Sequence, residues 1–214
     1  MAEGGGGTLR LDVPFTHQHK PLECGPVALR SALCFLRADT ETMVDDLCAL
    51  ICVDDAKAVS TVRLATAVAT LGFGVEFISV QPLFDEAHLG LGFYQTYGDV
   101  GSVEESTAHV EAARRAGAVV TTAHLDLDAL LARVTPLSAV VILLDYSVVL
   151  GTAGGYAGHF VVLTGYTPTE VTFHGRTAAG EDAPHMAVPR AVFDAARVAP
   201  GTDEDILVIS RRSP

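Results

Sequence analysis

Cys24-Gly25-Pro26 opens the apolar run that most constrains how this chain can fold. Apolar residues follow at most positions between Val27 and Leu36, so a helix there would be apolar around most of its circumference and buried on nearly all sides. Proline suits a first helical turn, because its missing N–H would have no partner there anyway. The sequence therefore predicts a buried central helix near residues 25 to 37, with Cys24 held rigidly near its N-terminus.

The position of Cys24 suggests a reactive thiol. The partial positive charge of a helix N-terminus favours thiolate and can lower the pKa of a cysteine below its usual value of roughly 8.5. Gln18 lies six residues earlier. Together with the Cys24 backbone N–H it could stabilise a developing oxyanion, at about 2.7–4 kcal/mol per donor. Two plainer interpretations stay open, a buried structural thiol for Cys24 and a solvated loop residue for Gln18.

His159 is the histidine whose surroundings suggest chemistry. Three glycines, Gly154, Gly155 and Gly158, precede it, and the run from Phe160 to Tyr166 has the β-branched and aromatic residues of a buried strand. A remote histidine that begins a strand is a suitable general base for a cysteine nucleophile. The alternative is a histidine satisfied within the core or at its rim.

The other three cysteines are interpreted as structural. Cys34 falls inside the apolar helix, and Cys48 and Cys52 share one face of the next helical stretch. Such a pair is a poor zinc site, because tetrahedral zinc needs four ligands. We therefore expect no metal and no other cofactor.

Composition limits the partners and the location. A chain of 214 residues, 49% of them hydrophobic, can bury a core without disulfides. We expect a flexible tail over residues 1–8 and a single domain, monomeric, over residues 9–214. A net charge of −12 disfavours nucleic acid and anionic membranes as partners and favours basic or neutral substrates. Without an apolar run of roughly 18 residues or a signal peptide, the expected location is the cytoplasm, with the nucleus as an option.

Periodicity and turn signals predict an α+β fold with a mostly antiparallel sheet. The expected helices cover residues 25–37, 41–52, 60–71, 102–117, 126–134 and 189–198. The expected strands cover residues 74–80, 118–123, 138–144, 159–166, 170–174 and 205–210. Residues 81–101 are predicted to form a long loop whose aromatic side chains pack onto the body, with a substrate groove as the alternative.

Four motifs resemble the guanylyl cyclase domain-containing protein family over about residues 11 to 210: Val13-Pro14-Phe15, Gln18 with Cys24-Gly25, the run from Gly158 to Tyr166, and the run from Gly201 to Leu207. In its Gln, Cys and His motifs that family is similar to the peptidase domain of bacterial transporters that cleave double-glycine leader peptides. The resemblance implies a papain-like cysteine peptidase fold. It also implies that Gln18 serves the oxyanion, Cys24 is the nucleophile and His159 is the base.

One departure from the family pattern concerns the group that would orient His159. Relatives commonly carry Asn or Asp on the strand after the histidine, whereas residues 171–176 read Val-Thr-Phe-His-Gly-Arg. Asp145, Glu181 or Asp182 could substitute from another loop, and His174 could accept a hydrogen bond. A base without an orienting group loses control of its tautomer, so a catalytically weakened interaction module on the same fold stays open.

These observations predict a thiol hydrolase that cleaves a peptide or isopeptide bond of a peptide or protein substrate. The alternative enzyme is a guanylyl cyclase that converts GTP to cGMP, which would need Mg²⁺ or Mn²⁺ held by carboxylates. Candidate acids are Asp45-Asp46, Asp54-Asp55 and the run Asp203-Glu204-Asp205. The glycine-rich run 151–155 lacks the Lys-Ser/Thr pair that completes a phosphate loop.

Overall fold

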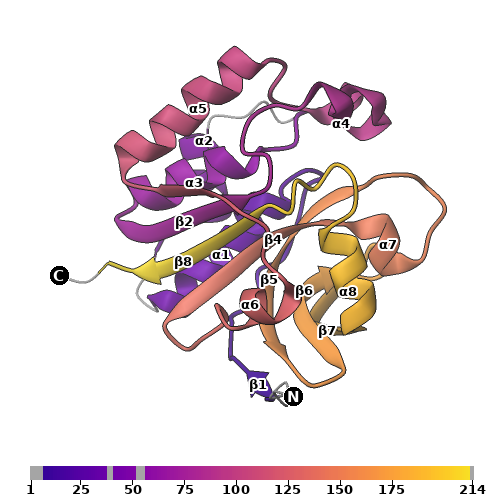
Figure 1. Ribbon diagram of the computed structural model, residues 1–214. Helices are drawn as coiled ribbons and strands as arrows, with labels where there is room; N and C mark the ends of the chain where they lie inside the picture. Colours follow the sequence, from indigo (N-terminus) through magenta and orange to yellow (C-terminus); the bar gives the residue numbers. More distant parts are fainter. Residues whose placement is uncertain (1–6, 38–40, 52–55, 213–214) are drawn as a thin grey trace, which may run out of the picture.

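A computed structural model describes residues 7–37, 41–51 and 56–212 (Figure 1). Its centre is an eight-stranded sheet in the order β3-β2-β8-β4-β5-β6-β7, with β1 paired to β5 beside this path. Only the β2–β3 pair is parallel, and all other pairs are antiparallel. The strands are β1 Leu9–Arg10, β2 Phe73–Ser79, β3 Val119–Thr122, β4 Ser138–Asp145, β5 Gly158–Tyr166, β6 Glu170–Arg176, β7 Asp182–Pro189 and β8 Ile206–Arg211.

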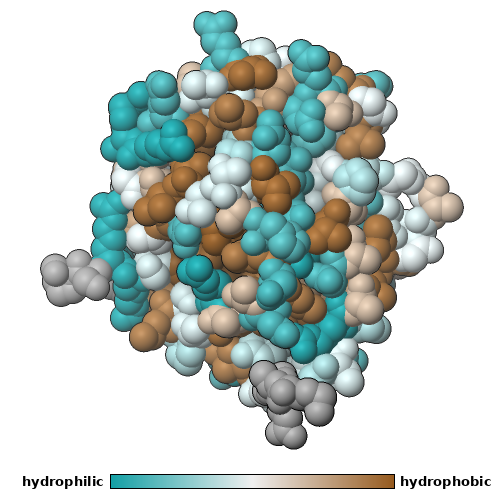
Figure 2. Space-filling model, viewed as in Figure 1, coloured by the Kyte–Doolittle hydropathy of each residue, from teal (hydrophilic) through white to brown (hydrophobic). Residues whose placement is uncertain are grey.

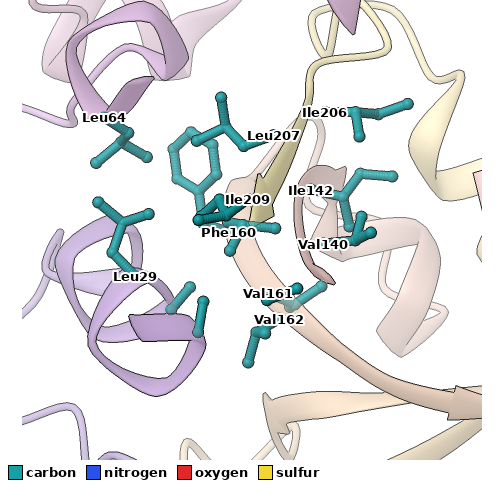
Figure 3. Close-up of a cluster of buried hydrophobic side chains, with 14 of the residues drawn as sticks. Leu29, Leu64, Val140, Ile142, Phe160, Val161, Val162, Ile206, Leu207 and Ile209 are labelled. Atoms are coloured by element: carbon teal, nitrogen blue, oxygen red, sulfur yellow. The ribbon is translucent and has the colours of Figure 1, made fainter. Parts of the chain in front are cut away.

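Helices cover both faces of this sheet, which gives the predicted α+β class. The helices are α1 Cys24–Leu36, α2 Val44–Ile51, α3 Thr61–Thr70, α4 Gly92–Tyr97, α5 Val103–Ala116, α6 Leu127–Leu131, α7 Tyr146–Leu150 and α8 Arg190–Arg197, with a 3₁₀ turn, η1, at Glu86–Gly90. Helix α1 packs on β4 and β5, α3 packs on β2, and α8 packs on β4, β6 and β7. In Figure 3, Leu29 of α1 and Leu64 of α3 lie on one side of the strands, and Ile142 and Ile206 lie on the other.

The predicted central helix is confirmed, one residue earlier than expected at each end. Cys24 is its first residue, and Leu29, Ala32 and Leu33 have no exposed surface. Gly25 permits the close packing of α1 against the start of α3, because a Cβ at this position would lie 2.7 Å from Val59 Cγ1. The backbone at Cys24 is thereby held between the sheet and α3.

The helix ends follow the predicted signals in part. At α5, Ser102 Oγ accepts a hydrogen bond from the Glu105 N–H at 3.1 Å, and Gly117 closes the helix with φ of 98°. Ser60 precedes α3 as predicted, but its hydroxyl makes no cap hydrogen bond, and its N–H donates instead to Asp99 Oδ2 at 2.9 Å.

Three segments differ from the prediction. Residues 81–101 contain η1 and α4 rather than only loop. Helix α7 was not predicted; it is five residues long and is capped by the Asp145 side chain. Strand β7 was not predicted either, because Pro184 and Pro189 argue against a strand. Proline is tolerated there because β7 is the last strand of the sheet. The predicted tail lies almost wholly outside the described residues, as do Cys52, Asp54 and Asp55.

The surface shown in Figure 2 mixes hydrophilic and hydrophobic residues. Among the helices of the described residues, none combines the length and the apolar character needed to cross a membrane.

Candidate active site

The sheet brings the two remote sequence motifs together. Helix α1 packs on β5, and the N–H of Phe160, near the start of β5, is directed at the thiol of Cys24, the first residue of α1. Cys24, His159 and Gln18 line the same small cavity, of about 30 Å³. The three residues singled out from the sequence therefore share one site, although 135 positions separate the thiol from the imidazole (159 − 24).

The thiol of Cys24 is deeply set at the N-terminus of α1. Burial raises its pKa, and the backbone N–H groups of Phe160, Gly25 and Cys24 itself act in the opposite direction. Burial is the larger effect, so the lowered pKa expected from the helix terminus is wrong for the free protein. The N–H of Phe160 stabilises the sulfur as an anion, and Phe160 is the residue directly after His159.

His159 is held in its neutral form. Part of its surface is open to solvent, yet the ring lies deep enough among protein atoms that burial lowers its pKa to about 4, with the positive charge of Arg176 as the second cause. The ring of Tyr146 packs against it with 4.4 Å between centroids. At neutral pH the site therefore contains a neutral imidazole beside a neutral thiol.

None of the four candidate orienting groups hydrogen-bonds to His159 among the described residues. Asp145 Oδ1 accepts from the N–H and hydroxyl of Ser147 and from the Ala157 N–H. Asp182 pairs with His17 at 2.6 Å, and Glu181 is exposed at a turn after β6.

His174, the fourth candidate, is occupied on both ring nitrogens. Its Nε2 lies 2.8 Å from the Val13 carbonyl oxygen, and its Nδ1 accepts from the His185 N–H at 3.2 Å. It ties the N-terminal segment to β6 and β7, and its role is structural.

Arg176 is a site residue that the sequence analysis did not assign. It ends β6 and lines the cavity of Cys24 and His159. Its guanidinium donates to the Gly180 carbonyl and, at 3.4 Å, to the Gln18 carbonyl. A cation thus stands on the strand where relatives commonly carry Asn or Asp. Its position as the last residue of the strand that follows the His159 strand was the only sequence signal available.

Gln18 is oriented by its own loop. Its side-chain nitrogen donates to the Lys20 carbonyl at 2.9 Å. A carboxamide nitrogen carries two N–H groups, so this bond leaves one N–H for a second acceptor.

Cys24 also lines a larger cavity, of about 110 Å³. Aromatic side chains from the 81–101 segment line it, among them Phe84, Phe93 and Tyr94. Tyr94 also packs onto the body of the protein, where its hydroxyl donates to the Gly201 carbonyl at 2.5 Å. The segment therefore combines the two roles that the sequence analysis treated as alternatives.

The described residues contain no group of three or more His, Cys, Asp and Glu side chains placed to hold a metal ion. Asp45 and Asp46 lie in the first turn of α2, where Asp46 Oδ2 accepts from the Met43 N–H. Cys34 lies in α1 and Cys48 in α2.

Known proteins similar to this chain fall into two groups. A family model described as guanylylate cyclase matches residues 13–209. A putative C39-like peptidase from Bacillus anthracis is 17% identical, with a TM-score of 0.50, over 97% of this chain and 100% of that one. The peptidase domain of Streptococcus ComA, a bi-functional ABC transporter involved in quorum sensing, is 11% identical, with a TM-score of 0.49, over 91% of this chain and 96% of that one. No curated protein matches the sequence. The fold is the papain-like fold of the C39-like peptidases, as predicted.

Proposed function

Because the chain belongs to the guanylylate cyclase family and has the papain-like fold, we propose that it is a thiol hydrolase that cleaves a peptide or isopeptide bond. The observation that carries the proposal is the shared cavity of Cys24, His159 and Gln18. A nucleophile at a helix start, a base at a strand start and an amide donor are the parts that cysteine hydrolases need.

In the proposed first step, His159 takes the proton of Cys24 as the sulfur attacks the carbonyl carbon. A C–S bond forms and the carbonyl π electrons move to oxygen. The imidazolium then gives its proton to the amine nitrogen as the C–N bond breaks. A lowered pKa suits His159 to the proton donation, because an acidic imidazolium releases its proton readily.

In the proposed second step, water attacks the thioester while His159 accepts one of its protons. The C–S bond breaks, the imidazolium of His159 returns its proton to the Cys24 sulfur, and the carboxylic acid product leaves the site. Both steps pass through an oxyanion, which the Cys24 backbone N–H and the remaining N–H of Gln18 would stabilise. The positive charge of Arg176 would add to this stabilisation.

The family description raises a second candidate, the conversion of GTP to cGMP. It needs carboxylates that hold a divalent metal, and no group of three or more His, Cys, Asp and Glu side chains among the described residues is placed to hold one. Manganese- or magnesium-dependent cGMP formation that survives Cys24→Ala would favour this alternative over the hydrolase.

The proposal is tested by incubating the protein with a peptide library derived from a proteome and with isopeptide-linked peptides. New amino groups, mapped by mass spectrometry, should appear with the unaltered protein and with Cys48→Ala, a control for loss of a thiol away from the site. They should be absent with Cys24→Ala and with His159→Ala. Cleavage that persists in Cys24→Ala, or no cleavage by any form, contradicts the proposal and leaves a noncatalytic interaction module on this fold.

A further inference from the structure

The cavity of about 110 Å³ beside Cys24 is large enough to hold part of a substrate. One water molecule needs roughly 10–15 Å³ on this measure, so the cavity exceeds that need several-fold. It lies between the first turn of α3, the 81–101 segment and the turn that leads into β8. Cys24 lines this cavity as well as the smaller one that contains His159. A group bound here would therefore be adjacent to the reacting bond.

Three buried oxygen atoms in the lining, Ser60 Oγ, Thr61 Oγ1 and Asp205 Oδ1, make no hydrogen bond of good geometry. The Thr61 and Ser79 hydroxyls nevertheless lie close enough to Asp205, and the Ser60 hydroxyl close enough to Asp99, to favour the charged form of each carboxyl. Thr61 is only 3% exposed, so its hydroxyl cannot turn to bulk solvent. Buried polar atoms without a hydrogen bond of good geometry are rare in folded proteins, and each one calls for an explanation such as a bound group. All three oxygen atoms can accept a hydrogen bond.

The charge around these oxygens is negative. Asp205, Asp203 and Asp99 all line the cavity, and none of the lining residues is Lys or Arg. Asp203 is paired with His88 at 3.1 Å, and Asp99 accepts from the Ser60 N–H with Arg63 3.9 Å away. Asp205 has no ion pair among the described residues. Burial and the nearby charge of Asp203 raise its pKa to about 7, against the smaller effects of Thr61, Ser79 and His88.

Aromatic rings complete the lining. The rings of Tyr94 and Tyr156 stack with 5.4 Å between centroids, and Phe93 meets both of them edge to face. Aromatic rings near a carboxylate favour an organic cation, because the ring face attracts positive charge. They also accommodate the methylene groups of a long side chain.

We propose that this cavity binds a primary ammonium group, that of a lysine-like side chain next to the bond that is cleaved. An ammonium has three N–H donors and no acceptor, and the buried Asp205 carboxylate and the hydroxyl oxygens of Ser60 and Thr61 in the lining can all accept from it. The position of the lysine next to the cleaved bond rests on the proposed function; the binding of the amine does not.

The test measures binding of three small probes of equal length by NMR titration at pH 8: n-butylamine, 1-butanol and butyrate. The protein carries Cys24→Ala, so catalysis has no part in the result. Butylamine should bind at least about tenfold more tightly than butanol, the difference expected for a hydrogen bond to a charged group. Butyrate should bind more weakly still. Equal affinities for amine and alcohol, or tighter binding of butyrate, overturn the proposal.

Variants identify the site. Asp205→Asn should reduce butylamine affinity to that of butanol, whereas Asp12→Asn, which removes an exposed charge elsewhere, should leave it unchanged. If Asp205→Asn does not fold, Thr61→Val provides the same test, because it removes a hydroxyl without changing the shape of the side chain. Unchanged butylamine binding in a folded Asp205→Asn or Thr61→Val protein refutes the assignment.

The two proposals can fail separately. Butylamine binding without peptide cleavage would retain the ammonium site and reject the hydrolase. Cleavage without butylamine binding would retain the hydrolase and reject the ammonium site. Butylamine binding together with cleavage that shows no preference for a basic residue beside the bond would reject the placing of the lysine there.

Discussion

At His159, burial and the guanidinium of Arg176 act in the same direction, and both disfavour the imidazolium. A carboxylate in place of Arg176 would have the opposite effect. The site is therefore electrostatically unlike a cysteine, histidine and aspartate arrangement, in which the third group stabilises the charged ring. In the proposed mechanism the guanidinium of Arg176 stabilises the oxyanion and the thiolate, and His159 is protonated only transiently.

Removing this cation should raise the pKa of His159. We predict that Arg176→Gln moves the pKa of the ring from about 4 upward towards 6.5, because one of its two causes of depression is lost. NMR titration of the His159 ring protons measures this without any substrate. Arg115→Gln removes an exposed arginine on α5 and should leave the titration unchanged. A His159 pKa that is the same in both variants would contradict the proximity of Arg176.

Gln18 is expected to act only when charge develops on the substrate oxygen. We predict that Gln18→Ala lowers kcat by about 100- to 1,000-fold with little change in KM, the effect of removing one oxyanion donor. The matched control is Gln95→Ala, whose side-chain amide donates to the Leu89 carbonyl and does not line the small cavity. Equal losses in the two variants would show that Gln18 serves only its loop.

At the scale of elements, the position of Cys24 depends on the contact of α1 with the start of α3. Gly25→Ala would bring a Cβ within 2.7 Å of Val59 and 3.1 Å of Leu64. Overpacking of this kind costs about 1–3 kcal/mol, and we predict a loss of this size in the free energy of unfolding, measured with urea. Gly154→Ala, with no atom within 4 Å, should change it by less than about 0.5 kcal/mol. Similar values for the two variants would argue against a tight α1–α3 contact.

In the turn before β8, the carboxylate of Asp205 is proposed to bind an ammonium group and also lowers the stability of the fold. The pKa of Asp205 is raised from 3.8 to about 7, a shift worth up to about 4 kcal/mol of unfolding free energy. Below pH 3.8 the raised pKa of Asp205 does not change the free energy of unfolding. As the pH rises it lowers that free energy increasingly, and the full loss is reached above about pH 7. The groups that face Asp205 are Asp203, His88 and the hydroxyls of Thr61 and Ser79.

Asp205→Asn should therefore stabilise the protein at pH 8 and change its stability little at pH 4. Urea unfolding at the two pH values measures the difference, with Asp12→Asn as the exposed control. A smaller free energy of unfolding for Asp205→Asn at pH 8 would mean that the carboxylate supports the fold, and that it is not held in the cavity at a cost to stability.

Across the whole molecule, the elements that could be predicted are those whose sequence signals lie within a short stretch of residues. The apolar run after Cys24, the cap at Ser102 and the β-branched run after His159 each correspond to an observed element. Strand β7 was missed because its prolines are tolerated only at a sheet edge, and the position of an edge depends on the tertiary fold.

The features of the candidate site also divide into those that the sequence predicts and those that depend on the tertiary fold. Cys24, His159 and Gln18 could be chosen from residue type and spacing. The charge of Arg176 beside His159 and the burial of the Asp205 carboxylate could not, because both follow from contacts between segments distant in sequence. The sequence also suggested a lowered pKa for Cys24, since the helix terminus can be read from residues and the depth of burial cannot.

The most direct test of the account is the rate of alkylation of each cysteine by iodoacetamide at pH 7, mapped by mass spectrometry. Burial alone raises the pKa of Cys24 and would make it slow to react. If His159 accepts its proton, Cys24 should react at least about tenfold faster than the other cysteines, and His159→Ala should abolish this advantage. Equal rates for the four thiols, or a fast Cys24 that is indifferent to His159→Ala, would contradict the proposed pairing of thiol and imidazole.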